Sequence, residues 1–416
     1  MRLALALIAA SCASAADWPQ WLGPARDGHA SRTETGLLGE WPKDGPRMLW
    51  RIEGLGDGYG APAVVGGRLY VISNQGMAEE TLTALSVEDG KTIWRVKLGP
   101  VGNPDQAPAY PAARSTPSID GNLVYAFSSN GDLVCAEAAS GKVRWRKSVR
   151  DAEFGGLPGK WAYAESPLVD GNTVLVSPGG PQASLLALDK RSGKVIWKSA
   201  LPGGEAAAYS SAVISTAGGR RQYVQFMSKG VVGVDAKTGE LLWRYDETSK
   251  GPANIPTPVI SGDFVYSTAR SMTVGALVKL NPASGKAEQV YFERGLPSAI
   301  GGAVKVGDTL YGTMSDGLVA ADFATGKQRW KHESVGAGSI LHAAGRLYVY
   351  GEDGATALVE ANPEEYVERG RFTPPGKPAH PRGAREKSWA YPVVANGRLY
   401  LRDLGVMWCY DVRATK

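Results

Sequence analysis

The chain has 416 residues, enough for one large all-β domain or for two or three ordinary domains. Its 46 Lys and Arg stand against 41 Asp and Glu, and the excess is spread along the chain without a block of like charge, so nothing indicates nucleic acid binding. The 53 glycines and 26 prolines exceed average usage only modestly and show no collagen period, so they indicate many turns.

Residues 1–16 are predicted to be a signal peptide. The apolar run Leu3–Ala10 is followed by small residues, with an Ala-x-Ala-like cleavage site after Ala15 or Ala16. The run is too short to span a bilayer. Cys12 admits a second interpretation, lipidation as in a bacterial lipoprotein. Both interpretations place the mature chain outside the cytoplasm, in the periplasm or in the medium.

Residues 17–46 are expected to form an irregular segment that packs on the main domain, residues 47–416. Its opening, Asp17–Gly28, contains two Trp, two Pro and two Gly, which indicates a loop pinned by aromatic side chains. A ligand contact by this segment is the alternative.

A motif of strand, tight turn and strand recurs through the main domain. Gly233–Arg244 reads Gly-Val-Asp-Ala-Lys-Thr-Gly-Glu-Leu-Leu-Trp-Arg. Near-copies are found at Ala84–Arg95, Cys135–Arg146, Ala187–Lys198 and Ala320–Lys331, and a weaker copy without the Trp at Lys279–Val290. The turn glycines recur every 41 to 52 residues, a period that is typical of β-propeller blades.

A second repeated element precedes each turn motif. It has the form Pro-x-Val/Ile-x-Gly-x-x-Leu/Val-Tyr, and its alternating apolar residues indicate a strand, a turn and a strand. With weaker copies included it occurs eight times, at Pro62–Tyr70, Pro117–Tyr125, Pro167–Leu175, Ala212–Tyr223, Pro258–Tyr266, Ala303–Tyr311, Ile340–Tyr348 and Pro392–Tyr400. Joined together, the two elements predict an all-β, eight-bladed propeller of four-stranded antiparallel blades.

The eighth blade lacks an outer strand at the C-terminal end of the chain. Its predicted third strand, Met407–Val412, is followed soon after by Lys416. Met48–Ile52 carries the outer-strand pattern yet precedes the first inner strand. We expect this N-terminal strand to complete the last blade, which closes the ring and removes its open edges.

The Trp of the turn motif is expected to wedge against the neighbouring blade. A buried Trp removes roughly 150–250 Å² from water, which is worth several kcal/mol at about 25 cal/mol per Å². Blade 5, with Gln289 at this position, and blade 7, around residues 360–369, lack the Trp and are expected to be looser. The six wedges are Trp50, Trp94, Trp145, Trp197, Trp243 and Trp330.

The turn motif Ala-x-Asp-x-x-Thr/Ser-Gly-Lys-x-x-Trp resembles the repeat of pyrroloquinoline-quinone (PQQ) propellers. That group includes the quinoprotein alcohol dehydrogenases and the outer-membrane assembly factor B lipoprotein. The resemblance covers about residues 47–412 and implies the propeller fold. It implies less about function, because the motif is a packing device shared by enzymes and scaffolds.

Function is expected on one face of the ring. The Val-x-Gly and Gly-Lys turns share a face and are short, whereas the blade-to-blade connections and the loops between second and third strands share the other. Three connections on that face are long: Leu98–Ala113, Val149–Ala164 and Phe372–Trp389. Long loops on a rigid scaffold commonly carry function.

The starts of the inner strands should ring the mouth of the central channel on the face with the long loops. Aromatic side chains beside a cation, a carboxylate and an amide suit a planar anionic ligand such as PQQ. The alternative is that these groups pair with one another and fill the mouth. The six candidates are Tyr59, Arg114, Glu165, Tyr209, Asn254 and Trp389.

The sequence lacks the features that the resemblance associates with quinoprotein dehydrogenases. It has no vicinal Cys pair and no matching calcium-site motifs, and no Cys-x-x-Cys-His for a covalent haem. The four histidines, His29, His332, His342 and His380, show no metal-ligand spacing, and no Ser/His/Asp motif occurs. Cys135 and Cys409 occupy the same repeat position in non-adjacent blades, beyond the roughly 7 Å limit for a disulfide.

The sequence therefore favours a non-catalytic exported propeller, monomeric and without a cofactor. It would bind an envelope protein or polymer through the face with the long loops. The alternative is a PQQ- and calcium-dependent quinoprotein dehydrogenase that oxidises alcohols or sugars.

Overall fold

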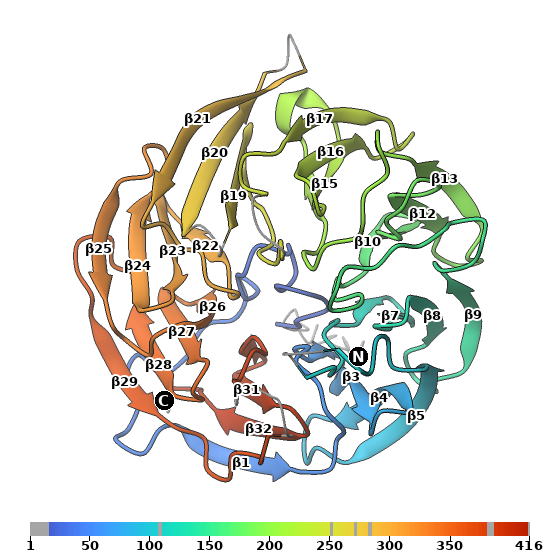
Figure 1. Ribbon diagram of the computed structural model, residues 1–416. Coiled ribbons are helices and arrows are strands. Elements are labelled where there is room, and N and C mark those ends of the chain that lie inside the picture. The colour runs from blue at the N-terminus through green and yellow to red at the C-terminus, as the bar shows by residue number, and fades with distance from the viewer. Residues whose placement is uncertain are drawn as a thin grey trace, which may run out of the picture.

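The chain folds into a ring of eight four-stranded antiparallel sheets, seen along the channel axis in Figure 1. The computed structural model describes residues 16–106, 110–249, 253–269, 273–281, 285–380 and 387–414. Cys12 and almost all of the predicted signal peptide lie outside these residues. No helix in the described part of the chain is long and apolar enough to cross a membrane. The predicted eight-bladed propeller is confirmed.

The first four blades follow one another along the chain, each running from its inner to its outer strand. Blades 1 and 2 comprise β2 (Ala63–Val65), β3 (Arg68–Gln75), β4 (Glu79–Ser86), β5 (Thr92–Gly99), β6 (Ser118–Asp120), β7 (Leu123–Phe127), β8 (Asp132–Glu137) and β9 (Val143–Ser148). Blades 3 and 4 comprise β10 (Leu168–Asp170), β11 (Thr173–Val176), β12 (Leu185–Asp189), β13 (Val195–Ser199), β14 (Val213–Ser215), the 3-10 turn η1 (Ala217–Gly219), β15 (Gln222–Phe226), β16 (Val231–Asp235) and β17 (Leu241–Tyr245).

The remaining blades repeat the same order, except that the last one has only three strands from this part of the chain. Blades 5 and 6 comprise β18 (Val259–Ser261), β19 (Phe264–Ala269), β20 (Val274–Leu280), β21 (Ala287–Arg294), β22 (Ala303–Val306), β23 (Thr309–Met314), β24 (Gly317–Asp322) and β25 (Gln328–His332). Blades 7 and 8 comprise β26 (Gly338–Ala343), β27 (Arg346–Gly351), β28 (Thr356–Glu360), β29 (Glu368–Phe372), β30 (Val393–Ala395), β31 (Arg398–Asp403) and β32 (Val406–Asp411).

The ring closes where the two ends of the propeller chain meet. β1 (Arg47–Ile52) pairs antiparallel with β32 and supplies the outer strand of blade 8. Trp50 lies opposite Cys409, the register that the Trp of the other blades also adopts. The predicted closure by the N-terminal strand is confirmed. Cys135 and Cys409 are both buried free thiols.

A buried arginine joins blade 8 to blade 1 closer to the channel. Arg402 on β31 is fully buried and donates to the carbonyls of Gly60 and Ile72, each at 3.0 Å, and to Oγ of Ser73 at 2.8 Å. Burial lowers the pKa of Arg402 to about 10, against the opposing charges of Asp57 and Asp403. The guanidinium therefore remains charged at neutral pH, and its hydrogen bonds offset the desolvation.

A regular seam between two blades consists of a Trp from one blade and the turn glycine of the next. Trp197 of blade 3 donates from Nε1 to the carbonyl of Ala236 at 3.2 Å. A Cβ on Gly239 would lie 2.4 Å from the Trp197 ring, and Gly239 has a φ of +74°. Only glycine suits both that backbone and that close approach. The corresponding bonds at three other seams are Trp50 to Val87, Trp94 to Ala138 and Trp145 to Lys190.

Blade 5 has a wedge that the turn motif does not reveal. Tyr291, two residues beyond Gln289, lies opposite Leu277 in the register that the Trp occupies elsewhere. Its hydroxyl donates to the carbonyl of Phe323 at 3.1 Å, and its ring covers Gly326 in blade 6. The β20–β21 hairpin is longer than its counterparts, which shifts the wedge along the sequence. Blade 5 thus lacks the Trp, as expected, but has another wedge, and its expected looseness stays a prediction.

The seam between blades 4 and 5 lacks the docking of a Trp on a turn. Nε1 of Trp243 donates to Gln222 in its own blade. A Cβ on Gly285, the turn glycine of blade 5, would have none of the described residues within 4 Å. The Trp243 ring is still 7% exposed and shares a core cluster with Val265 and Val278 of blade 5. Trp243 therefore fills this seam without covering the turn glycine Gly285.

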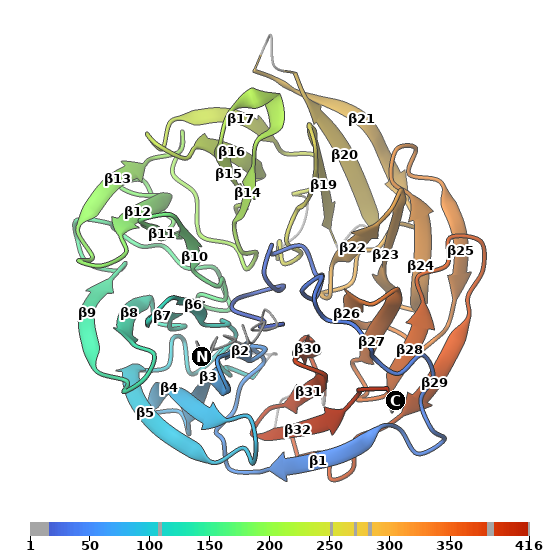
Figure 2. The same cartoon turned by 180° about the vertical axis from the view of Figure 1, so that it is seen from behind.

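Residues 16–46, which we name the strap, cross the centre of the ring on the face that carries the short turns (Figure 2). We call this the turn face. The strap contacts every blade. Its contacts, in order from blade 1 to blade 8, are Trp18 with Val64, Pro19 with Ile119, Arg26 with Pro167 and with Ala212, Trp21 with Thr257, His29 with Lys305, Ala30 with His342, and Glu34 with Gly397.

Arg26 is the most deeply buried cation of the strap, at 3% exposure. It donates to the carbonyls of Ser166 and Pro167 in blade 3, each at 3.0 Å, and to that of Ala212 in blade 4 at 2.9 Å. Burial lowers the pKa of Arg26 to about 9, and the nearby Glu165 opposes this shift. The strap is thus fixed to the ring by a charged group that has exchanged water for three carbonyls.

Two further side chains of the strap support its ends. His29 Nδ1 lies 2.9 Å from Nδ1 of His342 on β26, and burial together with the charge of His29 lowers the pKa of His342 to about 4. Trp41 packs edge-on against Phe372 and Tyr348 of blade 7, with ring centroids 5.2 and 5.7 Å apart. Trp41 therefore supplies an aromatic ring to the blade whose outer strand has no Trp.

Candidate binding site at the loop-rich face

The loop-rich face lies opposite the strap and carries the blade-to-blade connections. Three of the six sequence candidates meet there at adjoining blades. The rings of Tyr59 and Trp389 have centroids 5.0 Å apart, and the Arg114 guanidinium lies 5.6 Å from the Tyr59 ring. Burial raises the pKa of Tyr59 to about 12, so its hydroxyl is neutral. These residues precede the inner strands of blades 1, 2 and 8, which explains their convergence.

Arg114 directs its guanidinium at backbone carbonyls of two long connections. It donates to Tyr110 at 2.9 Å, to Ala112 at 3.1 Å and to Trp161 at 3.4 Å. Burial lowers the pKa of Arg114, and interaction with Tyr59 and other acidic groups opposes the shift. Arg114 therefore ties the connection between blades 1 and 2 to the connection between blades 2 and 3.

Tyr209 supports the second of these connections. Its hydroxyl accepts a hydrogen bond from the backbone N–H of Trp161 at 3.1 Å, and the two rings meet edge-on with centroids 5.6 Å apart. A Cβ on Gly159 would lie 2.4 Å from the Tyr209 hydroxyl, so the loop is packed tightly on this ring. Burial raises the pKa of Tyr209.

Glu165 lies away from this aromatic group, at the seam between blades 3 and 4. Its carboxylate accepts hydrogen bonds from the backbone N–H of Ser177 and from Nε2 of Gln225, the latter at 3.2 Å. Glu165 is 3% exposed, and burial raises its pKa to about 7 despite these hydrogen bonds and the charge of Arg26. The contacts of this carboxyl are those of a link between blades.

Asn254 has a similar position at the seam between blades 4 and 5. Its amide nitrogen donates to the carbonyls of Met227 and Ser228, at 2.7 and 3.1 Å, and to Oγ of Ser249 at 2.9 Å. Its Oδ1 is buried and has no hydrogen-bond partner among the described residues. The six candidates are thus divided between an aromatic group and two seam links, and ligand binding by them stays a prediction.

The donor groups at the mouth do not fit a calcium-bound PQQ. Arg114 donates its hydrogen bonds to three backbone carbonyls, and both oxygens of Glu165 accept hydrogen bonds from protein groups. Within the described ranges, no three His, Cys, Asp or Glu side chains are grouped so that they could hold a metal ion. We derive no step through this cofactor.

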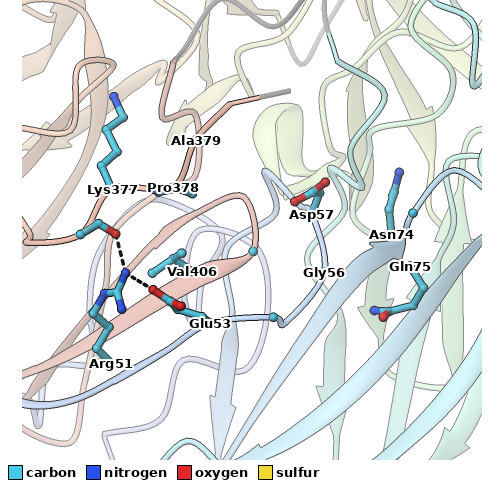
Figure 3. Close-up of a pocket in the computed structure, with 14 residues that line it drawn as sticks. Arg51, Glu53, Gly56, Asp57, Asn74, Gln75, Lys377, Pro378, Ala379 and Val406 are labelled. Carbon is cyan, nitrogen blue, oxygen red and sulfur yellow. Dashed lines mark hydrogen bonds and ion pairs between the residues drawn. The ribbon is translucent and has the colours of Figure 1, made fainter. Parts of the chain in front are cut away.

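A pocket of about 600 Å³ opens on the loop-rich face where blade 8 meets blade 1 (Figure 3). Arg51 lines one side, pairs with Glu53 and donates to the carbonyl of Gly376 at 2.6 Å. Asp57 and Asn74 lie on the other side. None of these residues was predicted from the sequence as part of a site. Arg51 and Asn74 lie near the ends of β1 and β3, and Glu53, Asp57 and Gly376 lie in connections that do not repeat.

The groups opposite Arg51 in this pocket are polar and only partly satisfied. Asp57 accepts a hydrogen bond from the Tyr110 hydroxyl at 2.8 Å. The amide nitrogen of Asn74 donates to the carbonyl of Pro111 at 2.6 Å, whereas its buried Oδ1 has no partner in the described part of the chain. The pocket thus offers both signs of charge, which suits a polar group of a partner.

Ser388, Asp403 and His380 form a buried cluster that was also not predicted from the sequence. The Asp403 carboxylate accepts a hydrogen bond from Ser388 Oγ at 2.9 Å and lies 3.3 Å from His380 Nε2. In a nucleophilic triad the imidazole stands between the hydroxyl and the carboxylate. Here both groups contact the carboxylate instead, so the imidazole is not placed to activate the serine.

Comparison with known proteins agrees with this architecture. A family model described as outer membrane protein assembly factor BamB matches residues 22–153, 78–311 and 277–365. Tetrathionate hydrolase of Acidithiobacillus ferrooxidans is 24% identical over 67% of this chain and 54% of its own length. The assembly factor BamB of Xanthomonas campestris is 28% identical over 34% of this chain and 30% of its own length. The chain therefore spans about half the length of the first relative and less of the second.

Solved structures share the fold at low sequence identity. BamB from Moraxella catarrhalis superposes with a TM-score of 0.61 at 16% identity, covering 89% of this chain and 98% of that one. A europium-containing methanol dehydrogenase gives 0.68 at 12% identity, covering 93% and 89%. The quinohemoprotein alcohol dehydrogenase ADHIIG from Pseudomonas putida gives 0.65 at 13% identity, covering 96% and 81%. At these identities the likeness concerns the fold alone.

Proposed function

The chain belongs to the family described as outer membrane protein assembly factor BamB, and on that premise we propose that it is a non-catalytic binding protein of the cell envelope. It holds an envelope protein on its loop-rich face. We further propose that it works as a monomer in the periplasm or outside the cell, without a bound cofactor.

The observation that supports this proposal is that the polar groups at the mouth bind the protein's own backbone. Arg114 and Tyr209 form hydrogen bonds with backbone groups of the long connections, at residues 110, 112 and 161. Such groups fix the shape of a surface and leave it ready to bind, which lowers the entropy cost of association. A catalytic group would instead need to present its reactive atoms to a substrate.

The connection between blades 2 and 3 offers an anchor for a protein partner. Leu157 is 48% exposed in it, and the Lys160 ammonium lies 5.5 Å from the Trp161 ring. Protein interfaces are enriched in aromatic side chains at their core and commonly depend on a few such anchors. The pocket beside Arg51 adds a polar recess where blade 8 meets blade 1.

A cross-linking experiment tests the proposal. A photo-reactive phenylalanine replaces Leu157 on the loop-rich face or Thr325 on the turn of blade 6 as the control. We expect a discrete envelope protein to be cross-linked from position 157 and not from position 325. The Leu157→Asp variant should then no longer bind the captured protein. Equal capture from both positions, or none from either, would overturn the assignment of this face.

The dehydrogenase alternative receives its own test. Purified protein is titrated with PQQ and calcium, and its melting temperature and dye reduction with alcohols or sugars are followed. We expect neither a shift nor dye reduction. A rise in melting temperature together with dye reduction would replace the scaffold proposal by an oxidoreductase.

Mass spectrometry of the mature N-terminus tests the proposed export. Cleavage after Ala15 or Ala16 is the expected result, and a lipid-modified Cys12 would mean an anchored form. An intact Met1 on protein isolated from the native cells would contradict export.

A further inference from the structure

The outer surface of blades 1–3 has an unusual charge. We define the basic wall as the outer strands of these blades with their preceding turns, residues 86–99, 137–148 and 189–199. These segments contain eleven Lys and Arg against four Asp and Glu. The corresponding segments of blades 4–7, residues 235–245, 280–294, 322–332 and 360–372, contain nine of each. The net charge of the basic wall is thus larger than the +5 of the whole chain.

The fold arranges these cations in two rows. In blades 1, 2 and 3, as also in blades 6 and 8, a basic residue occurs three positions before the wedge Trp and another one position after it. Since the blades are repeats of one structure, equivalent positions lie at equal height on successive outer strands. Figures 1 and 2 show β5, β9 and β13 following one another along the circumference. The rows are Lys91, Lys142 and Lys194, and Arg95, Arg146 and Lys198.

Most of these cations have no carboxylate to neutralise them. Lys91 pairs with Asp89 at 2.8 Å, but within the described ranges no carboxylate lies within ion-pair distance of the other five. Arg146 donates to the carbonyl of Lys97 at 2.7 Å, and Lys198 to that of Glu153 at 3.2 Å. Lysines on exposed strand edges also prevent aggregation. That role alone does not explain why five of these six cations on adjoining blades lack a carboxylate among the described residues. The equivalent Arg47 and Arg51 of blade 8 and Lys331 of blade 6 each pair with one.

Aliphatic side chains are exposed between the cations. Four of the eight large hydrophobic side chains exposed among the described residues belong to this wall. They are Ile93, Val143, Val195 and Ile196, with 44, 40, 40 and 48% exposure. Each of β5, β9 and β13 also pairs with only one neighbour, so its outward backbone edge is available to an added strand.

We propose that the basic wall binds a flexible acidic segment of a partner polypeptide. Its carboxylates contact the two rows of cations, and its aliphatic side chains pack on Ile93, Val143 and Ile196. Successive blades of an eight-bladed ring turn by about 45°, so the outer strands of blades 1 and 3 face directions about 90° apart. A flat bilayer cannot lie against all three strands, whereas a flexible chain follows the curve. This surface is separate from the loop-rich face.

Binding is measured with defined peptides and the full mature chain. One fluorescent 20-residue peptide contains ten Glu interspersed with Leu, Ser and Gly, and reaches about 70 Å when extended. A second has the same Glu with Ser in place of Leu. We expect the Leu-containing peptide to bind more tightly by about fivefold, because three exposed aliphatic side chains become buried. Both affinities should fall with added salt.

Paired charge reversals localise the binding. The double variant Lys142→Glu, Lys194→Glu should lower the affinity for the Leu-containing peptide by about tenfold or more, because two unpaired cations are replaced by anions that repel the peptide. The control, Lys237→Glu with Lys327→Glu, makes the same change in net charge on exposed turn lysines of blades 4 and 6. It should alter binding less than about twofold. Melting temperatures of both variants establish that they fold.

The other outcomes are equally defined. Equal weakening by the two variant pairs would mean general attraction to a basic protein and would overturn the proposal. Tighter binding of polyphosphate than of the Leu-containing peptide would also overturn it. The same holds if phosphatidylglycerol vesicles bind more tightly than this peptide and the wall variant loses vesicle binding. Cross-linking from position 157 in the Lys142→Glu, Lys194→Glu variant distinguishes the two surfaces. It should persist if the loop-rich face binds the envelope protein independently of the basic wall.

Discussion

The seam between blades 3 and 4 and the seam between blades 4 and 5 solve the same packing problem differently. At the first, Trp197 covers Gly239 and donates to Ala236 across the boundary. At the second, Trp243 donates within its own blade, and the space beside Gly285 holds none of the described residues. The Gly and the Trp of one copy of the repeated motif therefore act at two different seams. The Gly packs against the preceding blade and the Trp packs against the following one.

The strap reinforces the second seam on the turn face. Arg26 bonds to Ala212 of blade 4, and Trp21 Nε1 donates to Oγ1 of Thr257 in blade 5 at 2.9 Å. These contacts hold the two blades from a third element. The comparison teaches that contacts from a segment outside the ring can stabilise a seam at which the Trp does not cover the neighbouring turn glycine.

The largest expected effect is that of Trp197→Ala, which should lower the free energy of unfolding by about 3–5 kcal/mol. The substitution leaves a cavity at the seam and removes the hydrogen bond to Ala236. Unfolding in denaturant measures this loss of stability. Trp243→Ala is the matched variant at the other seam and should cost a similar amount, because that ring is also buried. An unchanged unfolding midpoint for either variant would contradict its role as a wedge.

Arg26→Ala should lower the free energy of unfolding by about 2–4 kcal/mol, since three buried carbonyls lose their donor. Hydrogen exchange should also rise selectively in blades 3 and 4 and at the seam to blade 5. Arg32→Ala is the control, because that strap residue is exposed. Uniform exchange changes around the ring would contradict the bracing role of the strap.

Glu165→Gln should change the pH dependence of stability at the seam between blades 3 and 4. Burial raises the folded pKa of Glu165 from 4.5 to about 7. Its stabilisation is therefore full below pH 4.5 and is lost as the pH rises through 7, by up to about 3 kcal/mol. The Gln variant lacks this loss, because its amide does not ionise. Parallel stability profiles of the two proteins from pH 4 to 8 would refute the shift.

Two glycine substitutions separate backbone strain from the joint itself. Gly239 and Gly285 both have positive φ, at +74° and +67°. Both Ala variants should lose about 1 kcal/mol from the backbone. Gly239→Ala should lose a further 1–3 kcal/mol or so, because its Cβ would meet the Trp197 ring. Equal losses in thermal unfolding would show that the ring does not constrain Gly239.

Tyr291→Phe is expected to have the smallest effect, about 1 kcal/mol, because it removes only the hydrogen bond to Phe323. Tyr291→Ala should cost about 3–5 kcal/mol if the ring replaces the missing Trp. Gln289→Ala is the comparison at the position that the motif assigns to the wedge. A larger loss from Gln289→Ala than from Tyr291→Ala would reverse the register argument.

Most of the architecture could be predicted because the blade repeats. Strand, turn and wedge recur at fixed spacing, so one copy predicts the others, and Met48–Ile52 could be matched to the blade that lacked it. Tyr291 was missed because a longer hairpin moved the wedge by two residues, a change that a spacing rule does not contain.

The site was less predictable, because it depends on segments that do not repeat. The candidates Tyr59, Arg114 and Trp389 converge since each precedes an inner strand. Nothing in their spacing indicates that Arg114 donates to carbonyls of two loops. The basic wall could have been found by comparing outer strands blade by blade, since a running count along the chain mixes them with acidic segments of other strands.

The pairing of β1 with β32 imposes an order on the assembly of the molecule. Residues 47–52 are made early in synthesis, but their partner strand begins only at residue 406. The first strand of the propeller must therefore wait, unpaired, until nearly the whole chain exists. Bringing such distant segments together is slow, and an unpaired strand edge invites wrong pairing meanwhile. Ring closure is thus the late step of folding, and a chain that stops before β32 leaves β1 without the strand with which it pairs.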